Sequence, residues 1–185
     1  MVGWSRTGIL GAIAASMPRY ERDTHSWSST LPVRRHPIAS SGKHPTMQNI
    51  PLDHDLIARL KSGYQLFSDE RRAFAVLFYD KLFARAPYLR SMFSTDLDEQ
   101  AAKLVAALDA IVNNLERPAE NAAMLKDMGK RHAGYGVKPE HYDLVIDLLC
   151  ESMGETAGDR LPAAQLDEWR LALRLVSDQM IAASG

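Results

Sequence analysis

From residue 52 onward, the apolar residues of this chain recur every three or four positions, which is the period of an α-helix. The clearest stretch covers about 97–115, where the apolar positions are Leu97, Ala101, Leu104, Leu108, Ile111 and Leu115. No segment of useful length alternates between apolar and polar residues, as a half-buried β-strand does. The pattern therefore predicts an all-α fold of about seven helices joined by short connections.

Prolines indicate where several of these helices begin or break. Pro87 interrupts a helical pattern and leaves only a short turn of helix after it. Other prolines fit the first turn of a helix, because the N–H group that proline lacks has no partner there. The predicted helices cover about 53–66, 69–85, 87–92 and 97–115, and three more begin near Pro118, Pro139 and Pro162.

Composition narrows the class of protein. The chain has 185 residues, 46% of them apolar, and a net charge of −1, which fits one globular domain and gives no indication of a nucleic-acid partner. Its apolar runs are shorter than the roughly 20 residues that span a bilayer, so we expect no transmembrane segment. The lone cysteine, Cys150, rules out an internal disulfide and fits a reducing compartment, so we expect a cytoplasmic protein. Cys150 falls on an apolar helical stripe, which predicts a buried side chain rather than a reactive thiol.

The first 46 residues differ from the rest. They carry six Lys or Arg and two Asp or Glu, are rich in Ser, Pro and His, and show no sustained periodicity. We expect a basic, disordered extension over 1–46 and an ordered domain over 47–185. Three interpretations stay open for the extension: a short signal-peptide core at 8–16, a biological start at Met47, or an amphipathic arm that contacts a membrane or partner.

Several enzyme motifs are missing from the sequence. It has no G-x-G-x-x-G or Walker loop, no pair of cysteines at metal-binding spacing and no H-E-x-x-H. We assign no catalytic residue. Any chemistry that the protein performs is therefore expected to come from a bound cofactor.

One histidine stands out near the end of the fifth predicted helix. His132 follows Leu125 and Met128 by seven and four residues, which places its imidazole on the apolar face of that helix. Two glycines follow shortly after it, as is typical of a helix end. A buried imidazole needs partners for its ring nitrogens. An ordinary hydrogen bond in the core is one candidate, and a metal ion such as iron is another.

Two polar side chains lie on the apolar sides of other predicted helices. Tyr79 comes one turn before Leu82 and Phe83, so its hydroxyl is expected to point into the core. Gln100 lies one turn before Leu104, at the polar edge of its stripe, where it is either a surface amide or part of a binding site. A buried phenol or amide needs a hydrogen-bond partner, so both are candidates for contact with a bound molecule.

The order and spacing of four segments are distinctive when taken together. They are LFYDKLF at 77–83, APYLRSMF at 86–93, MGKRHAGYGV at 128–137 and KPEHY at 138–142. With these segments the chain resembles the bacterial single-domain globins and the haem domain of flavohaemoglobins, over about residues 50–183. The resemblance implies a three-over-three globin fold with haem b held between its fifth and sixth lettered helices.

The resemblance also implies roles for particular residues. His132 matches the proximal iron ligand, and Tyr79 and Gln100 match distal residues that face bound gas. His141, the rival histidine, is expected to be exposed or hydrogen-bonded. The remaining expected cofactor contacts are Phe93 on the haem plane, Lys103 near a propionate, Leu104 beside the gas ligand, and Val137 and Tyr142 on the proximal side.

The function implied by the resemblance is reversible binding of oxygen, and also of nitric oxide and carbon monoxide, at pentacoordinate iron. Bound dioxygen carries partial negative charge, so a hydrogen bond from Tyr79 or Gln100 would stabilise it by roughly 1.5–3 kcal/mol. Two donors predict tight binding with slow release. That behaviour suits chemistry, scavenging or sensing better than bulk transport.

One departure from the flavohaemoglobins affects the expected activity. Their last globin helix carries a glutamate that hydrogen-bonds the proximal histidine, and a reductase domain follows. Here the segment at 180–185 has no carboxylate and no reductase sequence follows. We therefore expect nitric oxide dioxygenation to require an external reductase. The alternatives are a haem-based gas sensor whose N-terminal extension contacts a partner, and a helical interaction protein without haem.

Overall fold

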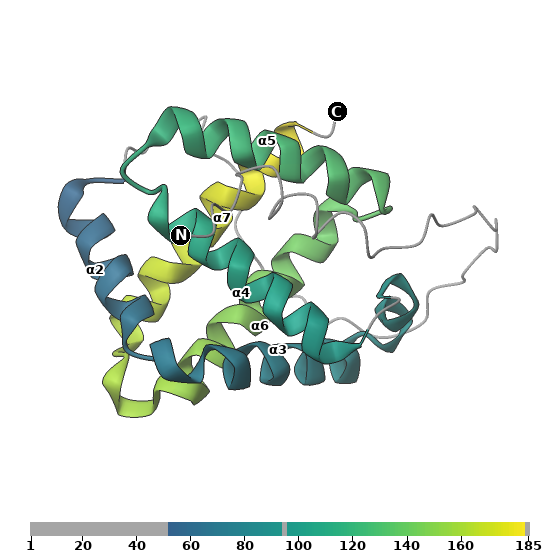
Figure 1. Cartoon of the computed structure of the whole chain (residues 1–185), viewed down its shortest axis with the longest axis horizontal. Coiled ribbons are helices and arrows are strands. Elements are labelled where there is room, and N and C mark those ends of the chain that lie inside the picture. Colours follow the sequence, from purple (N-terminus) through teal and green to yellow (C-terminus); the bar gives the residue numbers. More distant parts are fainter. Residues whose placement is uncertain (1–51, 94–95, 184–185) are drawn as a thin grey trace, which may run out of the picture. The chain divides into compact units, whose positions relative to one another are not determined.

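The computed structural model describes residues 52–93 and 96–183, and within them the chain is helical without a β-strand (Figure 1). The α-helices are α2 (His54–Gln65), α3 (Arg71–Arg85), α4 (Leu97–Asn113), α5 (Pro118–Gly134), α6 (Pro139–Ala157) and α7 (Ala163–Ala182). Three short 3-10 helices join them: η1 (Ser68–Glu70), η2 (Pro87–Met92) and η3 (Gly158–Arg160). The all-α prediction is confirmed. Among the described residues, the six α-helices and η2 together match the predicted number of about seven. The predicted disordered extension and its three interpretations lie outside the described residues.

Most helix boundaries follow the signals in the sequence. Asp53 caps α2, because its Oδ1 accepts a hydrogen bond from the Leu56 N–H at 2.7 Å. Pro118 and Pro139 occupy the first turns of α5 and α6. Pro162 is an exception, since its backbone is extended at φ −61° and ψ 150° and the helix begins one residue later.

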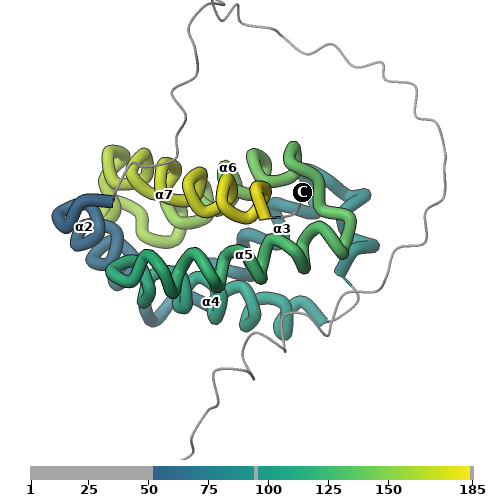
Figure 2. Tube along the Cα trace, turned by 90° about the horizontal axis from the view of Figure 1, so that it is seen from above, coloured from purple at the N-terminus to yellow at the C-terminus, as the bar shows by residue number. Residues whose placement is uncertain are grey.

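Packing arranges the helices in the two layers expected of a three-over-three fold. One layer contains α3, α6 and α7, in which α6 contacts both neighbours, and the other contains α2, α4 and α5. Contacts of α3 with α4, of α7 with α5, and of α7 with α2 join the layers. Figure 2 shows α4 and α5 on one side of the bundle and α6 and α7 on the other. No helix in the described part of the chain has the length and apolar character needed to cross a membrane.

The core holds the layers together through aromatic side chains at one end of the bundle. Tyr64 of α2 lies against Trp169 of α7 with ring centroids 5.9 Å apart, and against Phe67 at 5.3 Å. Phe67 in turn packs on Phe74 of α3 at 5.4 Å. Cys150 is buried on α6 with its Sγ 3.9 Å from the Leu166 carbonyl oxygen, which confirms the prediction of a buried thiol. These aromatic rings are buried and form the core at this end of the bundle.

Candidate functional site

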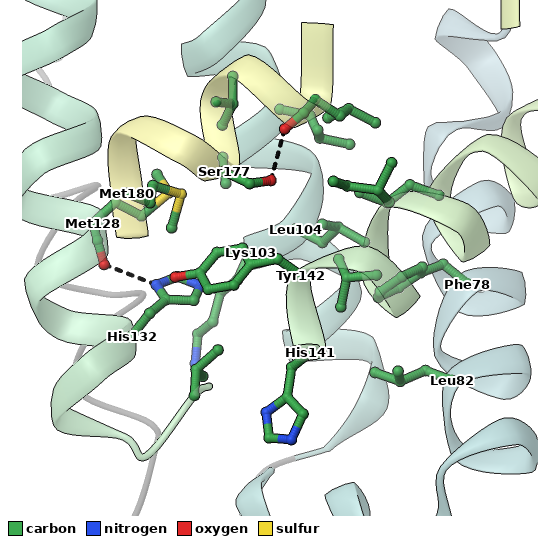
Figure 3. Close-up of a pocket in the computed structure, with 18 of the residues that line it drawn as sticks. Phe78, Leu82, Lys103, Leu104, Met128, His132, His141, Tyr142, Ser177 and Met180 are labelled. Atoms are coloured by element: carbon green, nitrogen blue, oxygen red, sulfur yellow. Dashed lines mark hydrogen bonds between the residues drawn. The ribbon is translucent and has the colours of Figure 1, made fainter. Parts of the chain in front are cut away.

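A cavity lies at the other end of the bundle, with walls from α3, η2, α4, α5, α6 and α7. Figure 3 shows side chains from facing helices pointing into it, with His132 on one side and Phe78 and Leu82 on the other. The structure brings all eight predicted site residues into the lining of this one cavity. They are Tyr79, Phe93, Gln100, Lys103, Leu104, His132, Val137 and Tyr142.

His132 is half-buried in the last turn of α5. Its Nδ1 lies 2.8 Å from the Met128 carbonyl oxygen, and because a carbonyl only accepts, Nδ1 carries the proton and donates it (Figure 3). In the described part of the chain this is the only hydrogen bond of the ring. The Nε2 lone pair is then left for a ligand. Burial lowers the pKa of His132, the hydrogen bond to Met128 partly opposes this shift, and the Arg131 charge lowers the pKa by a smaller amount. The net shift is downward, so the ring is neutral at neutral pH.

The end of α5 explains why Val137 lies beside His132. Gly136 adopts φ +79°, a left-handed conformation that glycine accepts without strain. Its N–H donates to the Ala133 carbonyl oxygen at 3.0 Å, and the Val137 N–H donates to the His132 carbonyl oxygen at 3.0 Å. These two hydrogen bonds form a Schellman motif, which turns the chain back toward the helix. The second predicted glycine thus ends the helix and places Val137 in the cavity wall.

Tyr79 and Gln100 contribute polar groups to the cavity from α3 and α4. Tyr79 is 6% exposed, and its hydroxyl has no hydrogen-bond partner among the described residues. Burial alone raises its pKa, so the phenol remains protonated and able to donate. Gln100 is 3% exposed, which excludes the alternative that it is a surface amide. Both side chains therefore lie in the interior of the domain.

Basic side chains form another part of the lining. Lys103 pairs with Glu99 at 2.8 Å, and Arg131 pairs with Asp127 at 3.0 Å, each one helical turn away. Both cations line the cavity, whose walls are otherwise mainly apolar. This combination suits a molecule that is largely apolar and carries acidic groups. Sequence reasoning missed Arg131, although its position next to His132 was a usable signal.

His141 also lines the cavity, but its ring serves another purpose. Its Nδ1 accepts a hydrogen bond from the Lys138 N–H at 3.2 Å and so caps the first turn of α6. This agrees with the expectation that it is hydrogen-bonded. Tyr135 was not predicted as a site residue, and it lies in the same wall because it begins the turn after α5.

The last helix contributes Ser177 and Met180 to the cavity (Figure 3). Ser177 uses its hydroxyl to donate to the Leu173 carbonyl oxygen at 2.7 Å. No Asp or Glu is among the described residues that line the cavity. The acceptor for the His132 Nδ1–H is accordingly a backbone carbonyl of its own helix and not a carboxylate of α7.

A comparison with protein families gives a match between residues 76–180 and the globin family. The chain belongs to the globin family. Over 104 residues this globin is 33% identical to the flavohemoprotein of Rhizobium meliloti (strain 1021). The aligned stretch covers 55% of this chain and 26% of that relative. It therefore spans about a quarter of the length of that relative.

Solved structures show the same fold. A bacterial globin from Campylobacter jejuni matches with a TM-score of 0.62 and 20% identity, over 71% of this chain and 96% of that one. A flavohemoglobin from Malassezia yamatoensis, solved with bound FAD and heme, matches with a TM-score of 0.62 and 19% identity, over 72% of this chain and 36% of that one. The predicted globin fold is confirmed. The roles of the eight cavity residues remain predictions.

Proposed function

We propose that this globin binds haem b in the cavity, with His132 Nε2 as the iron ligand. The observation that carries the proposal is the state of the His132 ring, which is neutral, has its Nδ1 proton fixed on the Met128 carbonyl and keeps a lone pair at Nε2. Neutral imidazole is a common ligand of haem iron. The residues present fit such a group, because the His132 imidazole, apolar walls and the cations of Lys103 and Arg131 meet in one cavity.

When bound, haem iron supplies one open coordination position, at which dioxygen, nitric oxide or carbon monoxide binds reversibly. The chain contributes the surroundings of that position. We assign the Tyr79 hydroxyl and the Gln100 amide as hydrogen-bond donors to the gas ligand. Both are buried, and a donor in a dry environment interacts more strongly with a partly charged ligand than it would in water.

The remaining lining residues would hold the cofactor. Phe93, Leu104, Val137 and Tyr142 present apolar surface to the macrocycle and exclude water. The cation of Lys103 is suited to a propionate, because a charge-assisted hydrogen bond to a carboxylate is stronger than a neutral one. Its side chain is 11% exposed, so it lies along the wall rather than in solvent.

An absorption titration with hemin tests the proposal. The full chain, freed of any cofactor, should bind hemin in a 1:1 ratio and develop a sharp Soret band that shifts on reduction and again on addition of carbon monoxide. His132→Ala should lose this behaviour. His141→Ala is the matched control, since it removes an imidazole that lines the same cavity, and should retain it. A wild-type chain that gives only the spectrum of free hemin would reject the proposal.

We propose a secondary activity, the conversion of nitric oxide and dioxygen to nitrate. The overall reaction, NO + O2 + e⁻ → NO3⁻, consumes one electron, which a reductant must supply. Purified holoprotein with an external reductant should consume nitric oxide aerobically faster than an equal amount of free hemin. Equal rates would reject this activity and would leave reversible gas binding unaffected.

A further inference from the structure

Helices α5 and α7 meet backbone to backbone at Gly129. A Cβ atom built on Gly129 would lie 2.2 Å from the Met180 carbonyl oxygen and 2.8 Å from the Met180 Cα and carbonyl carbon. Real Cβ atoms essentially never come within 3.0 Å of a heavy atom of a residue elsewhere in the chain. The atoms in the way belong to a helix backbone in a packed interior, so they cannot move aside as a flexible side chain can. Only glycine allows α5 to rest on α7 at this point.

This contact lies next to the group that holds the His132 ring. Gly129 directly follows Met128, whose carbonyl oxygen accepts the hydrogen bond from His132 Nδ1. Figure 3 shows Met128 and Met180 close together above the imidazole. The ring takes its orientation from α5, and α5 takes its position from α7 one residue away from the acceptor.

No second helix holds the His132 ring through a hydrogen bond in the described part of the chain. Its only hydrogen bond is to a residue of α5, and its nearest aromatic neighbour is Tyr142 of α6, with ring centroids 6.2 Å apart. A displacement of α5 is therefore carried directly to Nε2. Small errors in the placement of a reacting or ligating group have large consequences.

We propose that Gly129 is a positioning residue for the iron ligand. Its missing side chain seats α5 on the Met180 backbone and so sets how far His132 reaches into the cavity. The inference rests on the proposed haem binding. In Gly129→Ala the methyl group would have to move from 2.2 Å to at least 3.0 Å from the Met180 oxygen, which pushes α5 and the imidazole away from α7.

The same helix provides a matched control. Gly134 lies two residues after His132, and a Cβ atom built there meets nothing within 4 Å. Gly134→Ala thus makes the same chemical change on α5 without a collision. Wild type, Gly129→Ala and Gly134→Ala would be loaded with hemin and reduced. The readouts are the iron–histidine stretching band in the resonance Raman spectrum and the rate of hemin loss to an excess of an apoprotein acceptor.

Gly129→Ala should shift the iron–histidine band and lose hemin on the order of tenfold faster, as substitutions that disturb the support of a metal ligand do. Gly134→Ala should match wild type in both. Equal bands and equal loss rates for the two variants would overturn the inference. A wild-type chain that binds no hemin would instead overturn the proposed function on which the inference depends.

A second comparison separates positioning from general packing. In His132→Gly, imidazole added to the solution can serve as the ligand without being attached to α5. Adding Gly129→Ala to this background should leave the iron–imidazole band unchanged, and a shift as large as in the His132 protein would overturn the inference. If Gly129→Ala does not fold by circular dichroism, a crystal structure of the haem-loaded wild type decides. A retained contact between Gly129 and the Met180 backbone supports the inference, and a separation of the two helices there overturns it.

Discussion

The ring of Tyr79 packs edge-on against the ring of Phe93, with ring centroids 5.5 Å apart and an angle of 73° between the planes. Phe83 stacks on Tyr79 at 5.8 Å, and Phe78 lies against it at 5.0 Å. These contacts hold the ring in place through its apolar faces and edges. The hydroxyl is thus held at a fixed point of the cavity wall without a hydrogen bond of its own within the described residues.

Tyr79→Phe should preserve this packing, because phenylalanine keeps the ring, and should remove only the hydroxyl. We expect the oxygen dissociation rate of the haem-loaded protein to rise several-fold at least. The range is about ten- to a hundredfold if the lost hydrogen bond is worth roughly 1.5–3 kcal/mol. Stopped-flow mixing with carbon monoxide measures this rate. Tyr142→Phe is the control, since it removes a phenol from the same cavity on the His132 side. An unchanged rate in Tyr79→Phe would refute its distal role.

His141→Ala should weaken the fold slightly without affecting hemin binding. It removes the acceptor for the Lys138 N–H at the start of α6, and loss of such a cap costs about 0.5–2 kcal/mol. The free energy of unfolding from urea denaturation measures the effect. A variant that keeps the full wild-type stability would show that this cap contributes nothing.

The same histidine predicts a dependence of stability on pH. Burial lowers the pKa of His141 in the folded protein below its ordinary value of about 6.5. Between these two pKa values the unfolded chain binds more protons, so the stabilisation is present above about pH 6.5 and is lost as the pH falls below it. Urea denaturation between pH 5 and pH 8 should therefore show a smaller loss at acid pH for His141→Ala than for wild type. Parallel profiles for the two proteins would contradict this prediction.

Cys150 should be unreactive in the folded protein. Burial raises its pKa to about 11, so very little thiolate, the reactive form, exists at pH 8. Alkylation by iodoacetamide at pH 8, followed by mass spectrometry, should be slow in buffer and fast in urea. Because the folded pKa is raised, the unfolded chain loses this proton first, and the stabilisation that Cys150 contributes declines as the pH rises from about 9 to about 11. Rapid alkylation of the native protein would show that the thiol is accessible.

Phe74→Ala should be strongly destabilising, since the side chain is 0% exposed and packs on Phe67 in the aromatic core. Removal of a buried phenylalanine ring typically costs about 3–5 kcal/mol, and urea denaturation of the apoprotein measures it. Tyr88→Ala offers the contrast, because Tyr88 is 66% exposed and its loss should change stability by about 0.5 kcal/mol or less. Similar losses for the two variants would mean that Phe74 is not a core residue in solution.

Helical periodicity and the prolines were sufficient to predict the fold class and most helix boundaries, because both act within a few residues of the chain. The lining of one cavity by all eight expected residues followed from the resemblance to globins, not from periodicity. Neither periodicity nor the resemblance predicted that Arg131 and Tyr135 line the cavity, because their positions depend on how the chain turns from α5 into α6. The contact of Gly129 with Met180 was equally hidden, because it joins residues on two helices and involves no side chain at 129.

The turn after α5 limits how this part of the chain can change in length. Only residues 135–138 separate α5 from α6, and three of their N–H groups, those of Tyr135, Gly136 and Val137, are already bonded to carbonyls of the α5 end. An inserted or deleted residue would break that arrangement and displace His132 relative to Tyr142 at the same time. Insertions among relatives of this chain should therefore accumulate at other connections. A loop grafted at this turn would change the shape of the cavity as well as the turn itself.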